Sequence, residues 1–112
     1  MEKKELKDII VKQLEEQKIE EIICADVSKT SSIADYVIIG TGRSGKHAES
    51  TMENLKTYLK ENCSVGGLIN GTANDGWIVF DLGNIIVHLF EPEVRKIYKL
   101  EELFVLKNKK SK

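Results

Sequence analysis

The sequence predicts an α/β fold, in which a single domain is built from a mixed β-sheet with flanking helices. Two long segments carry apolar residues at the spacing of an amphipathic helix, and short apolar runs elsewhere have the length of strands. Two of these runs are separated only by Gly83-Asn84, which is a β-hairpin signal. The predicted order is helix, strand, strand, helix, a short strand, two strands and a helix. This order favours a sheet that contains strands of both directions.

The first half of the chain predicts two helices and two strands. A helix from about Lys3 to Gln17 has an apolar stripe made of Leu6, Ile9, Ile10 and Leu14. Ile19 to Val27 predicts a strand, and the nearly continuous apolar run from Asp35 to Gly40 is typical of a strand covered on both faces. Ser44 is a suitable N-cap for a second helix, which ends near Asn62 and has the apolar stripe Ala48, Met52, Leu55 and Leu59.

The second half predicts a short strand around Leu68-Ile69, then the hairpin and a last helix. In the hairpin, from Trp77 to Leu82 and from Ile85 to Phe90, the two-residue loop fixes the register, and paired residues share a face. One face is wholly apolar and must belong to the core: Ile78, Phe80, Leu82, Ile85, Val87 and Leu89. The other face pairs Trp77 with Phe90, Val79 with His88 and Asp81 with Ile86, and is either covered by another layer or used for binding. Helical turns are expected from Val94 to Leu106, with Tyr98, Leu100, Leu103 and Phe104 facing inward.

Composition and charge limit the classes of function. The 112 residues, 41% hydrophobic and 31% charged, suit one globular domain. We expect this domain to span residues 1–106, which carry 13 basic and 18 acidic residues, followed by a short basic tail at 107–112. An acidic body argues against sequence-specific nucleic-acid binding and suits a basic partner. No apolar run approaches the roughly 20 residues that span a bilayer, and the N-terminus lacks a signal-peptide core, so a cytoplasmic protein is expected.

The glycine-rich turn from Gly40 to Lys46 offers an alternative function. It fits the dinucleotide pattern GxGxxG and comes close to the P-loop pattern, and it follows a strand and opens a helix. However, His47 stands where a Mg²⁺-binding hydroxyl is needed, and the strand that ends at Asp81 turns straight back in a hairpin. A nucleotide-binding or nucleotidyl-transfer enzyme using Gly40 to Lys46 therefore remains the alternative, and its prediction is that ATP or NAD binds.

The histidines do not form a convincing catalytic or metal site. His88 and Asp81 are diagonal neighbours on the hairpin, roughly 7–8 Å apart, which is too far for a direct hydrogen bond. Two histidines without a cluster of further ligands make a poor metal site, so neither metal nor cofactor is predicted. The simpler role for His88 is that of a sheet histidine with a satisfied N–H group.

Two stretches of the sequence together resemble the ribosomal silencing factor (Iojap-related) family. The first runs from Asp35 to Gly42 and continues with Ser44 and His47. The second contains Gly76-Trp77, Asp81, Gly83, Val87-His88, Phe90, Pro92-Glu93, Arg95, Tyr98, Leu100-Glu101 and Leu103. Asn84 and Phe104 depart from the family pattern, which usually has Asp and Trp there. The resemblance implies a nucleotidyltransferase-like topology without enzymatic activity.

The resemblance also implies a function and a partner. Proteins of this family repress translation by binding a ribosomal protein on the inter-subunit face of the large subunit, which blocks joining of the small subunit. A homodimer is a further implied partner. The partner-binding residues expected here are Trp77, Asp81, His88, Phe90, Glu91, Glu93, Arg95, Tyr98 and Leu100. Aromatic anchors with a rim of carboxylates would suit a basic ribosomal protein. Trp77 can equally be plain core, and Arg95 can simply pair with Glu91 or Glu93.

Overall fold

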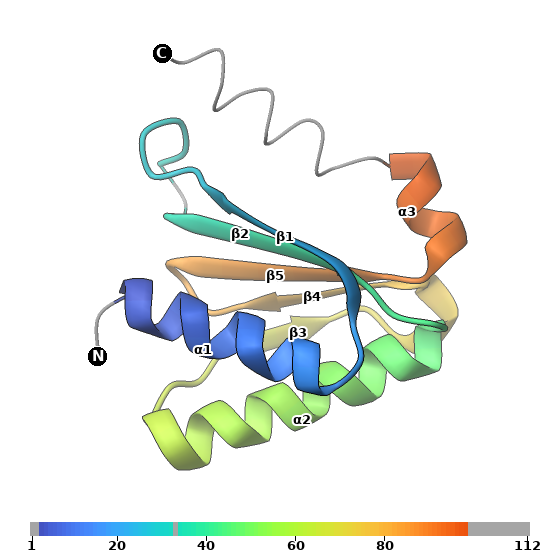
Figure 1. The fold of residues 1–112 in the computed structure, drawn as a ribbon, viewed down its shortest axis with the longest axis horizontal. Coiled ribbons are helices and arrows are strands. Elements are labelled where there is room, and N and C mark those ends of the chain that lie inside the picture. The colour runs from blue at the N-terminus through green and yellow to red at the C-terminus, as the bar shows by residue number, and fades with distance from the viewer. Residues whose placement is uncertain (1–2, 33, 99–112) are drawn as a thin grey trace.

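The structure, a computed structural model, describes residues 3–32 and 34–98 (Figure 1). Its elements in order are α1 (Lys3–Glu16), β1 (Glu20–Asp26), β2 (Tyr36–Thr41), α2 (Gly45–Cys63), β3 (Leu68–Asn70), the 3₁₀ turn η1 (Ala73–Asp75), β4 (Trp77–Asp81), β5 (Ile85–Phe90) and α3 (Pro92–Tyr98). The predicted helix from Val94 to Leu106 thus begins two residues earlier, at Pro92. Its second half, the inward-facing Leu100, Leu103 and Phe104, and the basic tail lie outside the described residues.

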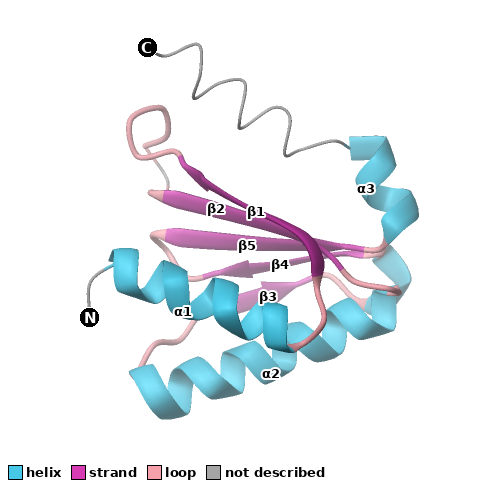
Figure 2. Cartoon of the chain, viewed as in Figure 1, coloured by secondary structure: helices cyan, strands magenta, loops and turns pink. Residues whose placement is uncertain are grey.

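The five strands form one mixed sheet in the order β1-β2-β5-β4-β3 (Figure 2). Strands β2 and β5 are parallel, and the other neighbouring pairs are antiparallel. Helices α1 and α2 lie together on one side of this sheet, whereas α3 follows β5 at its end (Figure 1). The predicted α/β class with a mixed sheet and flanking helices is confirmed.

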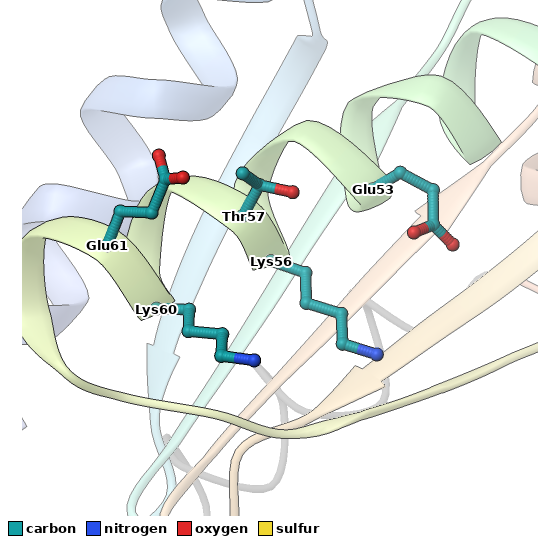
Figure 3. A pocket seen from close by; sticks show the side chains of 5 residues that line it. All are labelled: Glu53, Lys56, Thr57, Lys60 and Glu61. Carbon is teal, nitrogen blue, oxygen red and sulfur yellow. The ribbon is translucent and has the colours of Figure 1, made fainter.

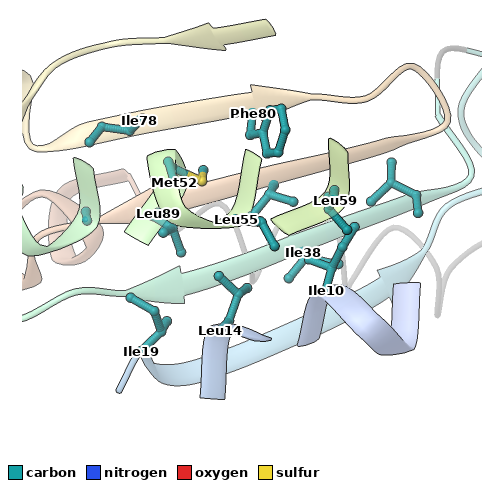
Figure 4. Close-up of a cluster of buried hydrophobic side chains, with 13 residues drawn as sticks. Ile10, Leu14, Ile19, Ile38, Met52, Leu55, Leu59, Ile78, Phe80 and Leu89 are labelled. Atoms are coloured by element: carbon teal, nitrogen blue, oxygen red, sulfur yellow. The ribbon is translucent and has the colours of Figure 1, made fainter. Parts of the chain in front are cut away.

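The main core fills the space between the sheet and helices α1 and α2 (Figure 4). Both predicted helical stripes face it, and the fully buried side chains include Ile10, Leu14, Met52 and Leu59. The apolar face of the hairpin faces it as well, since Ile78, Phe80, Ile85, Val87 and Leu89 are fully buried and Leu82 packs at the edge. Burial of this continuous apolar layer is the main driving force for the fold.

The hairpin has the predicted register. Trp77 pairs with Phe90, Val79 with His88 and Asp81 with Ile86. The Leu82 N–H donates to the Ile85 carbonyl at 2.9 Å, and Gly83 has a φ of +89°, which the first central residue of a type II′ turn requires. The two-residue loop therefore sets which side chains lie on each face of the sheet.

The second face of the sheet carries a smaller apolar cluster. Its buried members are Ala25, Val27, Ala34, Val37, Ile39 and Phe90, and Trp77, Ile86 and Val94 pack against them while partly exposed. Val94 belongs to α3, which therefore covers part of this face. Val79, His88 and Trp77 remain half-buried. Of the two alternatives for this face, a covering layer and a binding surface, the described residues thus show partial cover by α3.

Candidate functional site

Three rings on the second face of the sheet form a compact group, which we call the aromatic cluster: Trp77, His88 and Phe90. The ring centroids of Trp77 and Phe90 are 5.1 Å apart, and those of Trp77 and His88 are 6.0 Å apart. The His88 ring stacks on Phe90 with a centroid separation of 6.3 Å and an interplanar angle of 9°. The hairpin register produces this grouping, because it places Trp77 directly opposite Phe90 and diagonal to His88.

The members of the aromatic cluster differ in exposure. Phe90 is fully buried, so its ring supports the cluster from below. Trp77 and His88 are half-buried and hold the accessible part of the cluster. Both predicted roles of Trp77, core and binding residue, are compatible with this intermediate position, in which one side of the ring packs on Phe90.

His88 is held in one tautomer by Trp77. The indole Nε1–H donates to His88 Nδ1 at 3.1 Å, and an indole nitrogen can only donate. Burial lowers the pKa of His88 from its usual 6.5 to about 4, so the ring is neutral at pH 7 and carries its proton on Nε2. His88 is therefore a hydrogen-bonded sheet histidine, but the bond is accepted at Nδ1 and is not the satisfied N–H group that the sequence predicts.

Asp81 lies apart from the aromatic cluster. Its side chain is exposed and accepts a hydrogen bond at 2.8 Å from the N–H of Gly83, which helps to fix the hairpin turn. Strand β4 places Asp81 at the end opposite to Trp77. Among the described residues there is no group of three or more histidine, cysteine or carboxylate side chains that could hold a metal ion.

The predicted contact residues that follow β5 differ in accessibility. Glu91 is half-buried, and its N–H donates to the Gly76 carbonyl at 2.9 Å. Glu93 is exposed, and its carboxylate lies 3.9 Å from the Lys96 ammonium group, which makes a weak surface pair. Tyr98 is the last residue of α3. Leu100, the remaining predicted contact, lies outside the described residues.

Arg95, one of the predicted partner-binding residues, is buried. Its side chain is only 6% exposed, and Nη1 donates both to the Glu21 carbonyl at 2.7 Å and to Thr41 Oγ1 at 2.6 Å. The guanidinium is buried because α3 directs this side chain inward across the end of β2. Neither Glu21 nor Thr41 was predicted to belong to the site, since hydrophobic periodicity carries no signal for such a contact.

Several backbone N–H groups at the glycine turn donate hydrogen bonds to other atoms of the protein. Three N–H groups already have acceptors there: Gly42 N donates to Phe90 O at 2.8 Å, Arg43 N to His47 Nδ1 at 2.9 Å, and His47 N to Ser44 Oγ at 3.1 Å. His47 Nε2 also lies 2.7 Å from the Gln17 carbonyl, which ties α2 to the end of α1. Ser44 is the N-cap, as predicted. These acceptors occupy N–H groups that a phosphate-binding loop would turn toward its ligand.

Two glycines of this turn lie close to neighbouring backbone atoms. A Cβ on Gly45 would overlap the carbonyl oxygen of Ala73, so only glycine lets α2 approach η1 this closely. A Cβ on Gly42 would meet the backbone nitrogen of Ala48 at 3.1 Å, yet Gly42 is not among the residues with positive φ. The requirement at Gly42 is therefore space, and not the positive φ that would otherwise explain a glycine there.

Comparison with known proteins identifies the family. The family model described as "Ribosomal silencing factor during starvation" matches residues 1–112. This chain belongs to the ribosomal silencing factor family. The resemblance seen in the sequence is thereby confirmed, and the family is named for a regulatory role.

Individual relatives agree with this assignment. The ribosomal silencing factor RsfS of Zymomonas mobilis is 33% identical over 96 residues, which is 86% of this chain and 72% of that protein. A mouse protein named "Mitochondrial assembly of ribosomal large subunit protein 1" is 31% identical and is matched over 90% of this chain and 46% of its own length. A crystal structure from Chromobacterium violaceum has a TM-score of 0.86 at 30% identity, covering 93% of this chain and 87% of that one. A structure from Bacillus halodurans has a TM-score of 0.78 at 27% identity, covering 89% and 93%.

The nucleotide alternative loses its geometric basis in this silencing-factor fold. Asp81, which would have played the part of a Walker B carboxylate, lies at the end of the sheet opposite to the glycine turn. Lys46 is exposed. We expect Lys46→Ala to change the free energy of unfolding by less than about 0.5 kcal/mol, and ATP or NAD, with and without Mg²⁺, to leave the melting temperature unchanged.

Gly45→Ala provides the contrasting variant for this test. It adds one methyl group, but that group would overlap Ala73 O, so a clear loss of stability in a denaturant titration is expected. Micromolar affinity for ATP that disappears in Lys46→Ala would revive the nucleotide function.

A pocket elsewhere on the surface lies along the second half of α2 (Figure 3). It is lined by Glu53, Lys56, Thr57, Lys60 and Glu61, all from this helix. Two carboxylates and two ammonium groups lie here along α2, on the other side of the sheet from the aromatic cluster. This arrangement is that of a solvated helix surface.

No helix among the described residues is long and apolar enough to cross a membrane.

Proposed function

We propose that this protein represses translation by binding a basic protein on the inter-subunit face of the large ribosomal subunit. Bound there, it blocks association with the small subunit. The observation that carries the proposal is the match of the silencing-factor family model to residues 1–112. The name of the mouse relative, which refers to the ribosomal large subunit, supports the choice of subunit. The cytoplasm follows as the proposed location, and a homodimer stays a prediction.

The described surface supports a protein partner of basic character. Trp77 and His88 are half-buried aromatic residues, and the chain continues from β5 into the half-buried Glu91 and the exposed Glu93. Aromatic side chains at the centre of an interface contribute most of its binding energy, while carboxylates at the rim steer a basic partner toward it. Over residues 1–106 acidic groups outnumber basic groups by 18 to 13, which favours the same kind of partner.

The proposed mechanism needs only steric exclusion. The molecule measures 37 × 34 × 21 Å along its principal axes, so a copy bound between the subunits would hold apart surfaces that must touch in the assembled ribosome. No bond is made or broken, and the effect depends on occupancy alone. A repressor of this type acts in proportion to its concentration relative to that of free large subunits.

Sucrose-gradient sedimentation tests the proposal directly. Added to a mixture of isolated large and small subunits, the protein should lower the peak of assembled ribosomes and raise both free-subunit peaks. It should co-sediment with large subunits and not with small ones. An unchanged profile at saturating protein would show that the chain does not act by blocking association.

A further inference from the structure

The buried guanidinium of Arg95 joins three elements that are distant in the sequence. Arg95 lies in α3, Thr41 is the last residue of β2, and Glu21 lies in β1. A single nitrogen, Nη1, donates to the Glu21 carbonyl at 2.7 Å and to Thr41 Oγ1 at 2.6 Å. Hydrogen bonds from a charged donor are stronger than neutral ones, and burial of the group excludes competing water.

The acceptor at Glu21 exists because β1 contains a bulge. The pairing between β1 and β2 shifts between Glu20 and Ile23, so Glu21 has no partner residue on β2. Its φ of +50° is unusual for a residue with a side chain, and such a conformation persists only where its surroundings determine it. The bulge leaves the Glu21 carbonyl free to accept from Arg95.

Helix α3 depends on contacts of this kind. It has seven described residues, and an isolated helix of that length is not stable in water. Its apolar contact with the sheet is made by Val94, which packs against the cluster that contains Phe90 and Trp77. Arg95, the next residue, adds the polar contact with β1 and β2.

We propose that Arg95 is a positioning residue: it clamps α3 to the β1 bulge and to Thr41, and so holds α3 against the apolar cluster that contains Phe90 and Trp77, where a basic protein partner would bind. This inference rests on the proposed binding of the large ribosomal subunit. In the protein without the clamp, α3 leaves the sheet for part of the time. The dissociation constant for the partner then rises in inverse proportion to the fraction of molecules with α3 in place.

The experiment compares Arg95→Met with Lys96→Met. Both variants remove one positive charge from α3, but Lys96 is exposed and makes only the 3.9 Å contact with Glu93. Two quantities are measured: hydrogen exchange of the α3 amides in the free protein, and the dissociation constant for isolated large subunits. Because hydrogen bonds from charged donors are strong, we expect Arg95→Met to raise the exchange rate of the α3 amides by about tenfold or more. The dissociation constant should rise by up to about tenfold, the value reached when α3 is in place in one molecule in ten. Both quantities should stay within about threefold of the unaltered protein in Lys96→Met.

Further variants keep the test decisive if Arg95→Met folds poorly. Thr41→Val removes one acceptor and keeps the shape of the side chain, so it should raise α3 exchange and the dissociation constant by a few-fold, with most of the change in the rate of association. Arg95→Lys keeps a donor and should restore part of the affinity.

Two outcomes overturn the inference. Unchanged α3 exchange in both Arg95→Met and Thr41→Val would show that there is no clamp. Weaker subunit binding with unchanged α3 exchange would show that Arg95 contacts the partner directly. The exchange measurement uses the free protein, so it tests the clamp even if the unaltered protein does not bind large subunits. Failure of the unaltered protein to bind would contradict the proposed function and not the clamp.

Discussion

Replacing Trp77 by alanine is expected to weaken binding to the large ribosomal subunit by about thirtyfold, which corresponds to about 2 kcal/mol. The reason is its place in the aromatic cluster: one side of the indole packs on Phe90 at 5.1 Å, and the residue keeps an accessible side. A ring held in this way loses little conformational entropy when a partner covers it. Co-sedimentation across a range of protein concentrations measures the change.

Two further variants show whether the loss belongs to the binding surface. Tyr58→Ala removes a partly buried aromatic ring from α2, on the other side of the sheet, and should leave the affinity within about threefold of the unaltered protein, as a site without partner contact would. Glu93→Gln should cost less affinity than Trp77→Ala but should flatten the dependence of binding on salt, because a rim charge acts mainly through steering. Since Trp77 also supports packing, each variant is first checked for folding by circular dichroism. A folded Trp77→Ala protein with undiminished affinity would remove this face from the interface.

The hairpin and the faces of the sheet could be predicted from the sequence for a simple physical reason. A loop of two residues permits one register, and the alternation of side chains along a strand then assigns every residue to a face. Trp77, His88 and Phe90 could thus be placed together before the structure was known. The helical stripes were equally readable, because Ile10, Leu14, Met52 and Leu59 recur at the helical period.

The contacts of Arg95 and the close packing of Gly45 could not be predicted in this way. Arg95 and Glu21 are 74 positions apart, and the acceptor is a backbone carbonyl made available by a bulge. The sequence around Glu21 does not predict a bulge, because Glu21 has a positive φ although it is not a glycine. Gly45 suggested a phosphate-binding turn because a glycine before a helix has the same appearance whether it approaches a ligand or another segment. Only the position of Ala73 distinguishes the two.

His88 is expected to make the stability of the fold depend on pH between about 4 and 6.5. Its pKa is lowered from 6.5 to about 4 by burial, so within this window the unfolded chain binds a proton that the folded protein does not. The contribution is fully present above pH 6.5 and is lost as the pH falls toward 4. A difference of this size between the two pKa values corresponds to about 3 kcal/mol of unfolding free energy.

The hydrogen bond from Trp77 to His88 also favours the neutral ring. Protonation of Nδ1 would set one N–H donor against another at 3.1 Å, so the bond must break before the ring can become charged. Acid therefore breaks the hydrogen bond between Trp77 and His88, the two side chains that form the accessible part of the aromatic cluster. This links the pH dependence of stability to the surface proposed for partner binding.

The measurement compares the protein with His88→Gln by denaturant unfolding at a series of pH values. Glutamine keeps a polar group that can accept from Trp77 but does not titrate, while the carboxylates and His47 are the same in both proteins and cancel in the difference. Above pH 6.5 the difference in unfolding free energy should be constant. Below it, the unaltered protein should lose stability relative to His88→Gln, with most of the loss complete near pH 4. Parallel curves across the whole range would show that His88 titrates at its ordinary value and is not held neutral by the fold.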